Sequence, residues 1–304
     1  MDGRSSRACR EKSVAGAGDG ARVQTVMLIE AHQTRNPLSV AMSGLDPAAI
    51  GLPVRGRGAR ELIESIGRGV IRAVQLDLTM PGLRPRELDR SSRRDLAGLL
   101  RRVELGCSGF DVFLPPEHFL NSAHVDRAMS AVMGAIEFAG EFAGFSKGRE
   151  TLGSAGRAID PVCVRLPDGM PGTLLSALIA CGHKWGVDIA DFAACRRDVD
   201  GESAAMLVGL DTAEVVARGE EIAVEVAGAG PSLAAVRWTN VLRGMPGVRC
   251  EPGDARGSVG AAELGALLSI TGFGGYVVVD VRGVAQTPGL LERAVSAWRG
   301  EMAG

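Results

Sequence analysis

The sequence predicts a single α/β domain of the (β/α)8-barrel type. Eight short apolar runs alternate with amphipathic helical patterns between Pro37 and Trp298. Strands that alternate with helices form βαβ units and hence a parallel sheet, and this number of units is the one that closes a barrel. The rival is an open doubly wound sheet, which would carry a Gly-x-Gly-x-x-Gly turn after the first strand. Arg55-Gly56-Arg57-Gly58 is not that motif.

Each predicted strand is a short apolar run that stops at a polar, glycine or proline residue. The second run is the clearest, because it ends in the turn sequence Thr79-Met80-Pro81-Gly82. The predicted strands are Leu38–Ser43, Val70–Leu78, Cys107–Leu114, Val162–Leu166, Val187–Ala193, Ala205–Leu210, Leu233–Thr239 and Tyr276–Val281.

Helices are predicted where apolar residues recur at i, i+3, i+4 and i+7. Ala59, Leu62, Ile63 and Ile66 show this spacing in the first helix. The second helix starts near Asp89 or Ser92, and its capping-box signal is Ser92 with Asp95. The remaining helices are Ala123–Phe142, Thr173–His183, Thr212–Val226 with a break near Gly219, Ala262–Ile270 and Pro288–Trp298. A Gly/Pro-rich segment, Arg243–Gly260, replaces a regular helix after the seventh strand, and 145–160 reads as a loop.

Composition excludes several functional classes. The net charge is −2 and aromatic residues make up 4% of the chain, whereas nucleic-acid and anionic-membrane binders usually carry a basic excess and exposed aromatic platforms. Uninterrupted apolar runs stay shorter than a membrane span. The six cysteines form no Cys-x-x-Cys pair, so we expect reduced thiols and a cytoplasmic protein. Residues 1–35 are rich in Arg, Gly, Ser and Ala, which predicts a disordered extension before a barrel at 36–304.

Six segments of the chain, in four groups, carry a family resemblance. They are Ala73–Asp77, then Leu83–Leu88 with Ser91–Leu96, then Ser108–Asp111 with Pro115–Phe119, and finally Gly272–Asp280. In this order they resemble the second strand, the second loop and helix, the third strand and its loop, and the eighth strand of the sugar phosphate isomerase/epimerase family. That family belongs to the xylose isomerase-like TIM barrels.

The resemblance implies a small-molecule sugar or sugar phosphate as substrate, bound where the strands end. It also implies a divalent metal, Mn, Mg, Co or Zn, held there by Glu, Asp and His side chains. In such a site the metal polarises a carbonyl and a carboxylate moves the proton on the neighbouring carbon. The oligomeric state is left open.

The chain departs from the family pattern at the metal positions. Asp211 is retained, Glu214 stands where the family has His, and Asp280 stands where it has Glu. These three oxygen donors are the expected metal ligands, since carboxylates suit Mg and Mn. The fourth strand ends in Arg165 rather than Glu, and a guanidinium at that position would repel a cation.

The expected catalytic residues are Asp77, His118 and Asp280, and the expected substrate-binding residues are Glu117, Arg165 and Arg282. Each has a structural alternative that the sequence leaves open. Asp211 can serve as a helix N-cap, Asp280 and Arg282 can pair with each other, Asp77 can make a structural hydrogen bond, and His118 can lie on the surface.

Two functions therefore remain open. The first is a sugar or sugar-phosphate isomerase or epimerase with an altered metal site, which the acids Asp77, Asp211 and Asp280 favour. The second is a barrel that has lost the metal and catalysis and serves as a binding or accessory protein, which the altered ligand set favours. A DNA-repair function, known among other barrels of this superfamily, is disfavoured because the charge is balanced and a His-rich cluster is missing.

Overall fold

The computed structural model describes residues 36–51, 58–146, 160–193 and 206–300. These residues fall in one compact unit that spans 36–304. The predicted extension at 1–35 and most of the predicted loop at 145–160 lie outside the described residues.

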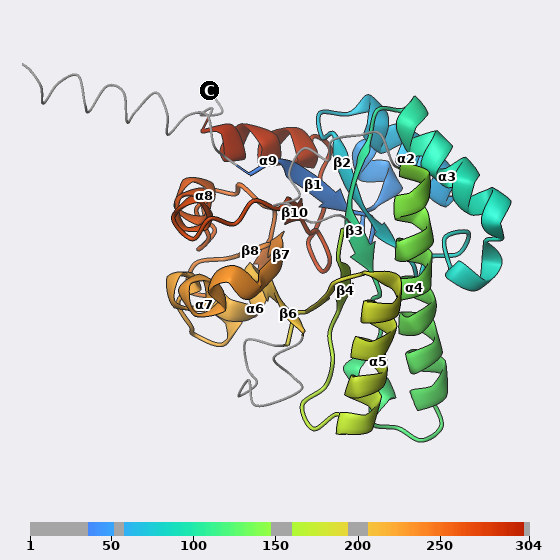
Figure 1. The fold of residues 1–304 in the computed structure, drawn as a ribbon. Coiled ribbons are helices and arrows are strands. Elements are labelled where there is room, and N and C mark those ends of the chain that lie inside the picture. Colours follow the sequence, from blue (N-terminus) through green and yellow to red (C-terminus); the bar gives the residue numbers. More distant parts are fainter. Residues whose placement is uncertain (1–35, 52–57, 147–159, 194–205, 301–304) are drawn as a thin grey trace, which may run out of the picture. The chain divides into compact units, whose positions relative to one another are not determined.

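Eight parallel strands close into a barrel in the order β1-β10-β7-β6-β5-β4-β3-β2 (Figure 1). The barrel confirms the predicted fold class and excludes the open sheet. Its strands are β1 (Leu38–Ala41), β2 (Ala73–Asp77), β3 (Gly106–Asp111), β4 (Val162–Val164), β5 (Ile189–Asp191), β6 (Leu207–Asp211), β7 (Leu233–Trp238) and β10 (Val277–Val279).

Helices follow the strands along the chain, and α4 and α5 pack side by side on the outside of the barrel (Figure 1). The α-helices are α2 (Ala59–Arg68), α3 (Arg90–Arg102), α4 (Val125–Ser146), α5 (Gly172–Trp185), α6 (Thr212–Ala217), α7 (Ile222–Ala229), α8 (Ala261–Ile270) and α9 (Leu290–Arg299). Short 3-10 turns are η1 (Pro47–Ile50), η2 (Pro85–Glu87), η3 (Pro116–Phe119) and η6 (Gly230–Ser232). Among the described residues, none of the helices has the length and apolar character needed to cross a membrane.

The predicted helix break near Gly219 is confirmed, and the predicted capping box at Ser92 is not. The break near Gly219 separates α6 from α7, and Gly219 adopts a left-handed φ of 73°, which suits a residue without a Cβ. The capping box predicted from Ser92 and Asp95 is wrong, because Asp89 is the N-cap of α3. Its carboxylate accepts a hydrogen bond of 2.7 Å from the Ser92 backbone N–H.

A two-stranded antiparallel hairpin begins just before the segment predicted to replace a helix after the seventh strand and ends within it. Its strands are β8 (Asn240–Val241) and β9 (Arg249–Cys250), and Val241 is in register with Arg249. The buried Asn240 side chain accepts hydrogen bonds from the backbone N–H groups of Val241, at 3.0 Å, and Val259, at 2.9 Å. One amide oxygen therefore ties the start of the hairpin to the chain that leaves it.

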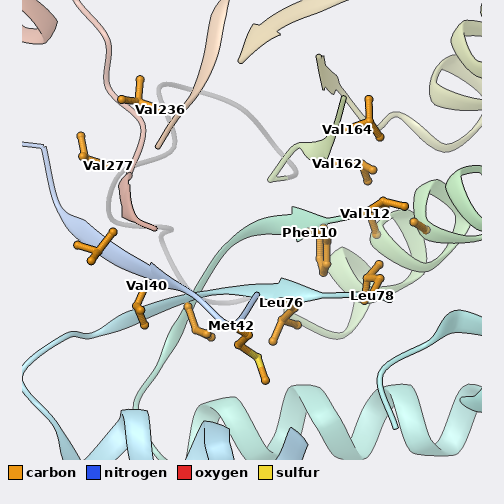
Figure 2. Close-up of a cluster of buried hydrophobic side chains, with 14 of the residues drawn as sticks. Val40, Met42, Leu76, Leu78, Phe110, Val112, Val162, Val164, Val236 and Val277 are labelled. Atoms are coloured by element: carbon orange, nitrogen blue, oxygen red, sulfur yellow. The ribbon is translucent and has the colours of Figure 1, made fainter. Parts of the chain in front are cut away.

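The apolar core lies between the strands and the surrounding helices. Figure 2 shows Val40, Met42, Leu76 and Phe110 on neighbouring strands, with Met42 and Leu76 pointing toward the helices. These side chains belong to the same buried cluster as the apolar faces of α2 and α3. Successive residues of a strand point to opposite faces, so the alternate positions face the inside of the barrel.

Polar side chains of β1, β2 and β3 make buried hydrogen bonds, and a second apolar cluster packs separately from the outer core, formed by Cys163, Ala190, Phe192, Ala234 and Ala235. Ser39 and Ser108 share a hydrogen bond of 2.5 Å, and the Gln75 amide donates to the Cys163 thiol at 3.4 Å. Burial raises the pKa of the Cys163 thiol to about 12, so this group stays protonated near neutral pH. Cys163 is one of the four described cysteines, all of which carry free thiols.

A clasp joins the first described residue to the last helix. The Trp298 indole N–H donates a hydrogen bond of 2.9 Å to the Asn36 carbonyl oxygen. The Asn36 amide in turn donates to the carbonyls of Phe273 and Gly275, at 2.6 and 2.9 Å. The clasp lies where β1 pairs with β10, the contact that closes the barrel.

Candidate active site at the mouth of the barrel

Acidic residues gather where the strands end. Because all eight barrel strands are parallel, their carboxyl ends form one face of the barrel, which carries the site in barrels of this type. Five strands end at or just before an aspartate, namely Asp77, Asp111, Asp191, Asp211 and Asp280. Each of these aspartates is at least nine-tenths buried, so each needs a compensating partner.

An inner network of two arginines and two aspartates joins the ends of β3, β7 and β10. The Arg237 guanidinium contacts Asp111 Oδ1 at 2.5 Å, and its Nε lies 3.9 Å from Asp280 Oδ2. The Arg282 guanidinium pairs with Asp280 and reaches Asp111 Oδ2 at 3.4 Å. Ser43 donates a further hydrogen bond of 2.7 Å to Asp111. The network balances two negative charges with two positive ones.

Aromatic rings cover both guanidinium groups of the inner network. Arg237 lies 3.7 Å from the centre of the Phe192 ring, and Arg282 lies 4.6 Å from that of Phe113. Cation–π contacts of this kind hold the flat guanidinium planes in place. Phe192 is buried, whereas Phe113 is 58% exposed.

The two arginines set the protonation of Asp280. Burial alone would raise the pKa of Asp280, but the charge and hydrogen bonds of Arg282, together with Arg237, outweigh burial and lower it. For Arg282, burial opposes the charged form, yet Asp280 and Asp111 raise its pKa. Asp280 is therefore a carboxylate near neutral pH and a weak proton acceptor.

An outer network holds the acids of the sixth strand and its helix. Arg165 makes a bidentate contact with Glu214, at 2.8 Å to Oε1 and 3.1 Å to Oε2. Arg249, from β9, lies 3.4 Å from Glu214 Oε1 and 3.6 Å from Asp211 Oδ2. The side chains of Arg165, Glu214 and Arg249 are 38%, 27% and 25% exposed, so a ligand can reach them.

Asp211 has a structural role at the start of α6. Its Oδ1 accepts hydrogen bonds from the backbone N–H groups of Ala213, at 3.0 Å, and Glu214, at 3.3 Å, which makes it the N-cap. Burial raises the pKa of Asp211, repulsion from Asp280 raises it further, and Arg249 and Arg237 partly offset both. The pKa of Glu214 is lowered, because Arg165 outweighs the effect of burial.

The other predicted site residues share no ion pair with the two networks among the described residues, although Asp77 lies in register with Asp111 on the neighbouring strand. Asp77 accepts hydrogen bonds from the Thr79 backbone N–H at 2.8 Å and the Thr79 hydroxyl at 2.6 Å, so it stabilises the turn after β2. Glu117 and His118 lie in η3, after β3. The His118 ring packs against His124 with a centroid distance of 4.7 Å. Of the predicted residues, the structure brings together Arg165, Asp211, Glu214, Asp280 and Arg282.

Sequence reasoning missed Ser43, Asp111, Arg237 and Arg249 as site residues. Arg237 had a usable signal, because a charged residue within the apolar run Ala234-Ala235-Val236-Arg237-Trp238 needs a buried partner. Asp111 had the same signal as Asp77, an acid at a strand end. Arg249 had none, since it lies far from Asp211 in the sequence and reaches it only through the hairpin.

The three predicted metal ligands do not fit a divalent metal as they lie. Glu214 is gripped by Arg165, Asp211 is used as a helix cap and faces Arg249, and Asp280 is paired with Arg282. Within the described ranges, no group of three or more His, Cys, Asp or Glu side chains is arranged to hold a metal ion. Guanidinium groups instead face the carboxylates that a metal would need.

Comparisons with known proteins identify relatives in fold. No family model matches the chain, and a search of curated proteins gives no match. Among solved structures, the E. coli 3-keto-D-glucoside 4-epimerase is similar with a TM-score of 0.62 and 13% identity, over 88% of this chain and 100% of that one. A D-tagatose 3-epimerase-like protein has a TM-score of 0.58 and 12% identity, over 86% of this chain and 94% of that one.

A third similar structure is a xylose isomerase domain protein from Planctomyces limnophilus. Its TM-score is 0.58 at 11% identity, over 89% of this chain and 98% of that one. At these identities the likeness concerns the fold. The chain therefore shares the closed parallel-barrel fold of these structures, as the resemblance in the sequence predicted.

Proposed function

We propose that the protein binds a sugar or sugar phosphate at the mouth of the barrel without a divalent metal in the carboxylate cluster. The observation that carries this proposal is the partly exposed outer network of Arg165, Glu214 and Arg249. A sugar hydroxyl is both a donor and an acceptor, so it matches a surface on which guanidinium donors alternate with carboxylate acceptors. Arginine also pairs with phosphate through two parallel hydrogen bonds.

The similar structures support the ligand class. Their names describe a 3-keto-D-glucoside 4-epimerase and a D-tagatose 3-epimerase-like protein, and barrels of this type place ligands at the carboxyl ends of the strands. The exposed ring of Phe113 beside Arg282 adds an apolar surface at the same face. We also propose that the protein acts in the cytoplasm, as expected from the pattern of its cysteines.

Isomerase or epimerase chemistry is the second candidate, and Asp77 favours it. Both hydrogen bonds from Thr79 go to Asp77 Oδ1, so Oδ2 is the oxygen available to accept a proton from the carbon next to a carbonyl. Arg165 and Arg282 would then stabilise the negative charge that forms on the carbonyl oxygen. This reaction uses only side chains of the mouth.

One experiment separates binding from catalysis. Protein treated with EDTA is titrated calorimetrically with aldoses, ketoses and their phosphates, and each mixture is followed by proton NMR in D2O. We expect saturable binding, weakened at least ~10-fold by Arg165→Met and unchanged by Arg256→Met. Arg256 is the control arginine, because it follows β9, is 77% exposed and pairs with Asp254.

The NMR measurement decides the second candidate. Exchange of the hydrogen next to the carbonyl for deuterium, lost in Asp77→Asn, supports isomerase or epimerase chemistry. Binding without exchange leaves a binding protein. If no sugar or sugar phosphate binds, or if binding requires added Mn²⁺ or Mg²⁺, the proposal of a metal-free sugar site is wrong.

A further inference from the structure

We infer that Arg249 and Arg165 act as built-in counter-cations for Asp211 and Glu214 and keep divalent cations out of the mouth of the barrel. The positions in question are those at which the family resemblance placed metal ligands. The inference concerns the charges of the cluster and holds whether or not a sugar binds there.

The hairpin delivers Arg249 to a fixed position. Arg249 is the first residue of β9 and pairs in register with Val241. A short connection joins β7, which ends at Trp238, to this hairpin. Its Nη1 donates a hydrogen bond of 3.2 Å to the carbonyl oxygen of Arg282, while Nη2 faces Glu214 and Asp211. A guanidinium held by a backbone carbonyl on one side and two carboxylates on the other has little freedom to leave.

All four carboxylate oxygens of this pair of acids are engaged. Glu214 Oε1 and Oε2 are held by the two terminal nitrogens of Arg165. Asp211 Oδ1 accepts two backbone N–H groups, and Oδ2 lies 3.6 Å from Arg249. Carboxylate oxygens are the ligands that Mg²⁺ and Mn²⁺ require, so a cation would first have to displace these donors.

The charge balance also opposes a divalent cation. The outer network joins two acids, Asp211 and Glu214, to two arginines. The inner network behind it is balanced as well, because Asp111 and Asp280 face Arg237 and Arg282. Neither network has an excess negative charge. A divalent cation that entered would therefore be repelled by the arginines, and this repulsion is strong in a partly buried site. A metal site of the same fold would instead leave its carboxylates uncompensated until the ion binds.

Removing the guanidinium groups should therefore create a cation site. The test compares wild-type protein, the double variant Arg165→Met/Arg249→Met and the control Arg256→Met, all treated with EDTA. Each is titrated with Mn²⁺, and the free ion is measured by electron paramagnetic resonance. Two carboxylates with water completing the shell are enough for weak Mn²⁺ or Mg²⁺ binding. We expect the double variant to bind at least ~10-fold more tightly than wild type and control.

Addition of Asp211→Asn to the double variant should abolish the gained binding, which would locate the ion at this pair of acids. Circular dichroism reports whether the double variant folds. If it does not, the single variants Arg165→Met and Arg249→Met replace it, each with a smaller gain expected. Wild-type protein that binds Mn²⁺ as tightly as the variants would overturn the inference. So would folded variants that bind Mn²⁺ no better than the control.

Discussion

Replacement of Arg237 by Met removes the most buried cation of the mouth. Arg237 is 5% exposed and contacts Asp111, which is 1% exposed, and Asp280, which is fully buried. The variant leaves two buried carboxylates to share the single guanidinium of Arg282. Breaking a buried ion pair by removal of one partner costs about 3–5 kcal/mol.

The cost should fall at the lower end of that range. Asp111 keeps its hydrogen bond from Ser43 and its contact with Arg282, and Asp280 keeps its pairing with Arg282. Methionine fills part of the space beside the Phe192 ring. We therefore expect a loss of ~3 kcal/mol in the free energy of unfolding. That corresponds to a drop of roughly 6–12 °C in Tm for a domain of this size class.

Urea unfolding at pH 7 of wild type, Arg237→Met, Asp111→Asn and the double variant tests this expectation. Because the two residues are in contact, the double variant should lose less stability than the sum of the single losses, by at least ~1 kcal/mol. A loss below ~1 kcal/mol for Arg237→Met, or additive losses in the double variant, would refute the view that this pair is coupled and buried.

Three further changes test other parts of the fold. Burial raises the pKa of Asp160 to about 7; the folded state then holds a proton that the unfolded state has lost, so this group's contribution to stability falls as pH rises from about 4 to 7. Asp160→Asn should accordingly raise Tm more at pH 8 than at pH 5 in calorimetric scans, and an equal change at both pH values would contradict this. Gly209→Ala should destabilise by ~1–3 kcal/mol in urea unfolding, because its Cβ would lie 2.8 Å from the Phe192 ring; an unchanged urea midpoint would show that the ring can move. Gly257→Ala would bring a Cβ within 1.9 Å of the Asn240 amide. We therefore expect faster hydrogen exchange at the backbone N–H groups of the hairpin, measured by mass spectrometry. Protection equal to that of the wild type would contradict this expectation.

Local periodicity was enough to predict the barrel. The positions of strands and helices depend on the spacing of apolar residues that are close together in the sequence. One example is Ala59, Leu62, Ile63 and Ile66, which form the buried face of α2. The number of strands then leaves few closed arrangements. Strand bounds were less accurate, since the run at 70–78 yields a strand only at Ala73–Asp77.

The site was predictable where the family resemblance could be aligned with strand ends. Asp211, Glu214, Asp280 and Arg165 were placed at the mouth because they stand where the resemblance puts metal ligands. The partners of these residues depend on contacts between distant segments: Arg237 meets Asp111 across 126 positions, and Arg249 meets Glu214 across 35. The first pair depends on how the barrel closes, and the second depends on the path of the hairpin. Neither feature can be recognised from the residues around these side chains in the sequence.

The clasp between Asn36 and Trp298 has a consequence for biosynthesis. The first strand emerges from the ribosome long before β10 and α9. One of its two edges pairs with β2, but the other pairs with β10. During translation, β1 therefore presents an open edge of the kind that pairs with other chains. Contacts that span 237 to 262 positions also form slowly. Nascent chains that lack β10 are thus exposed to aggregation through this edge.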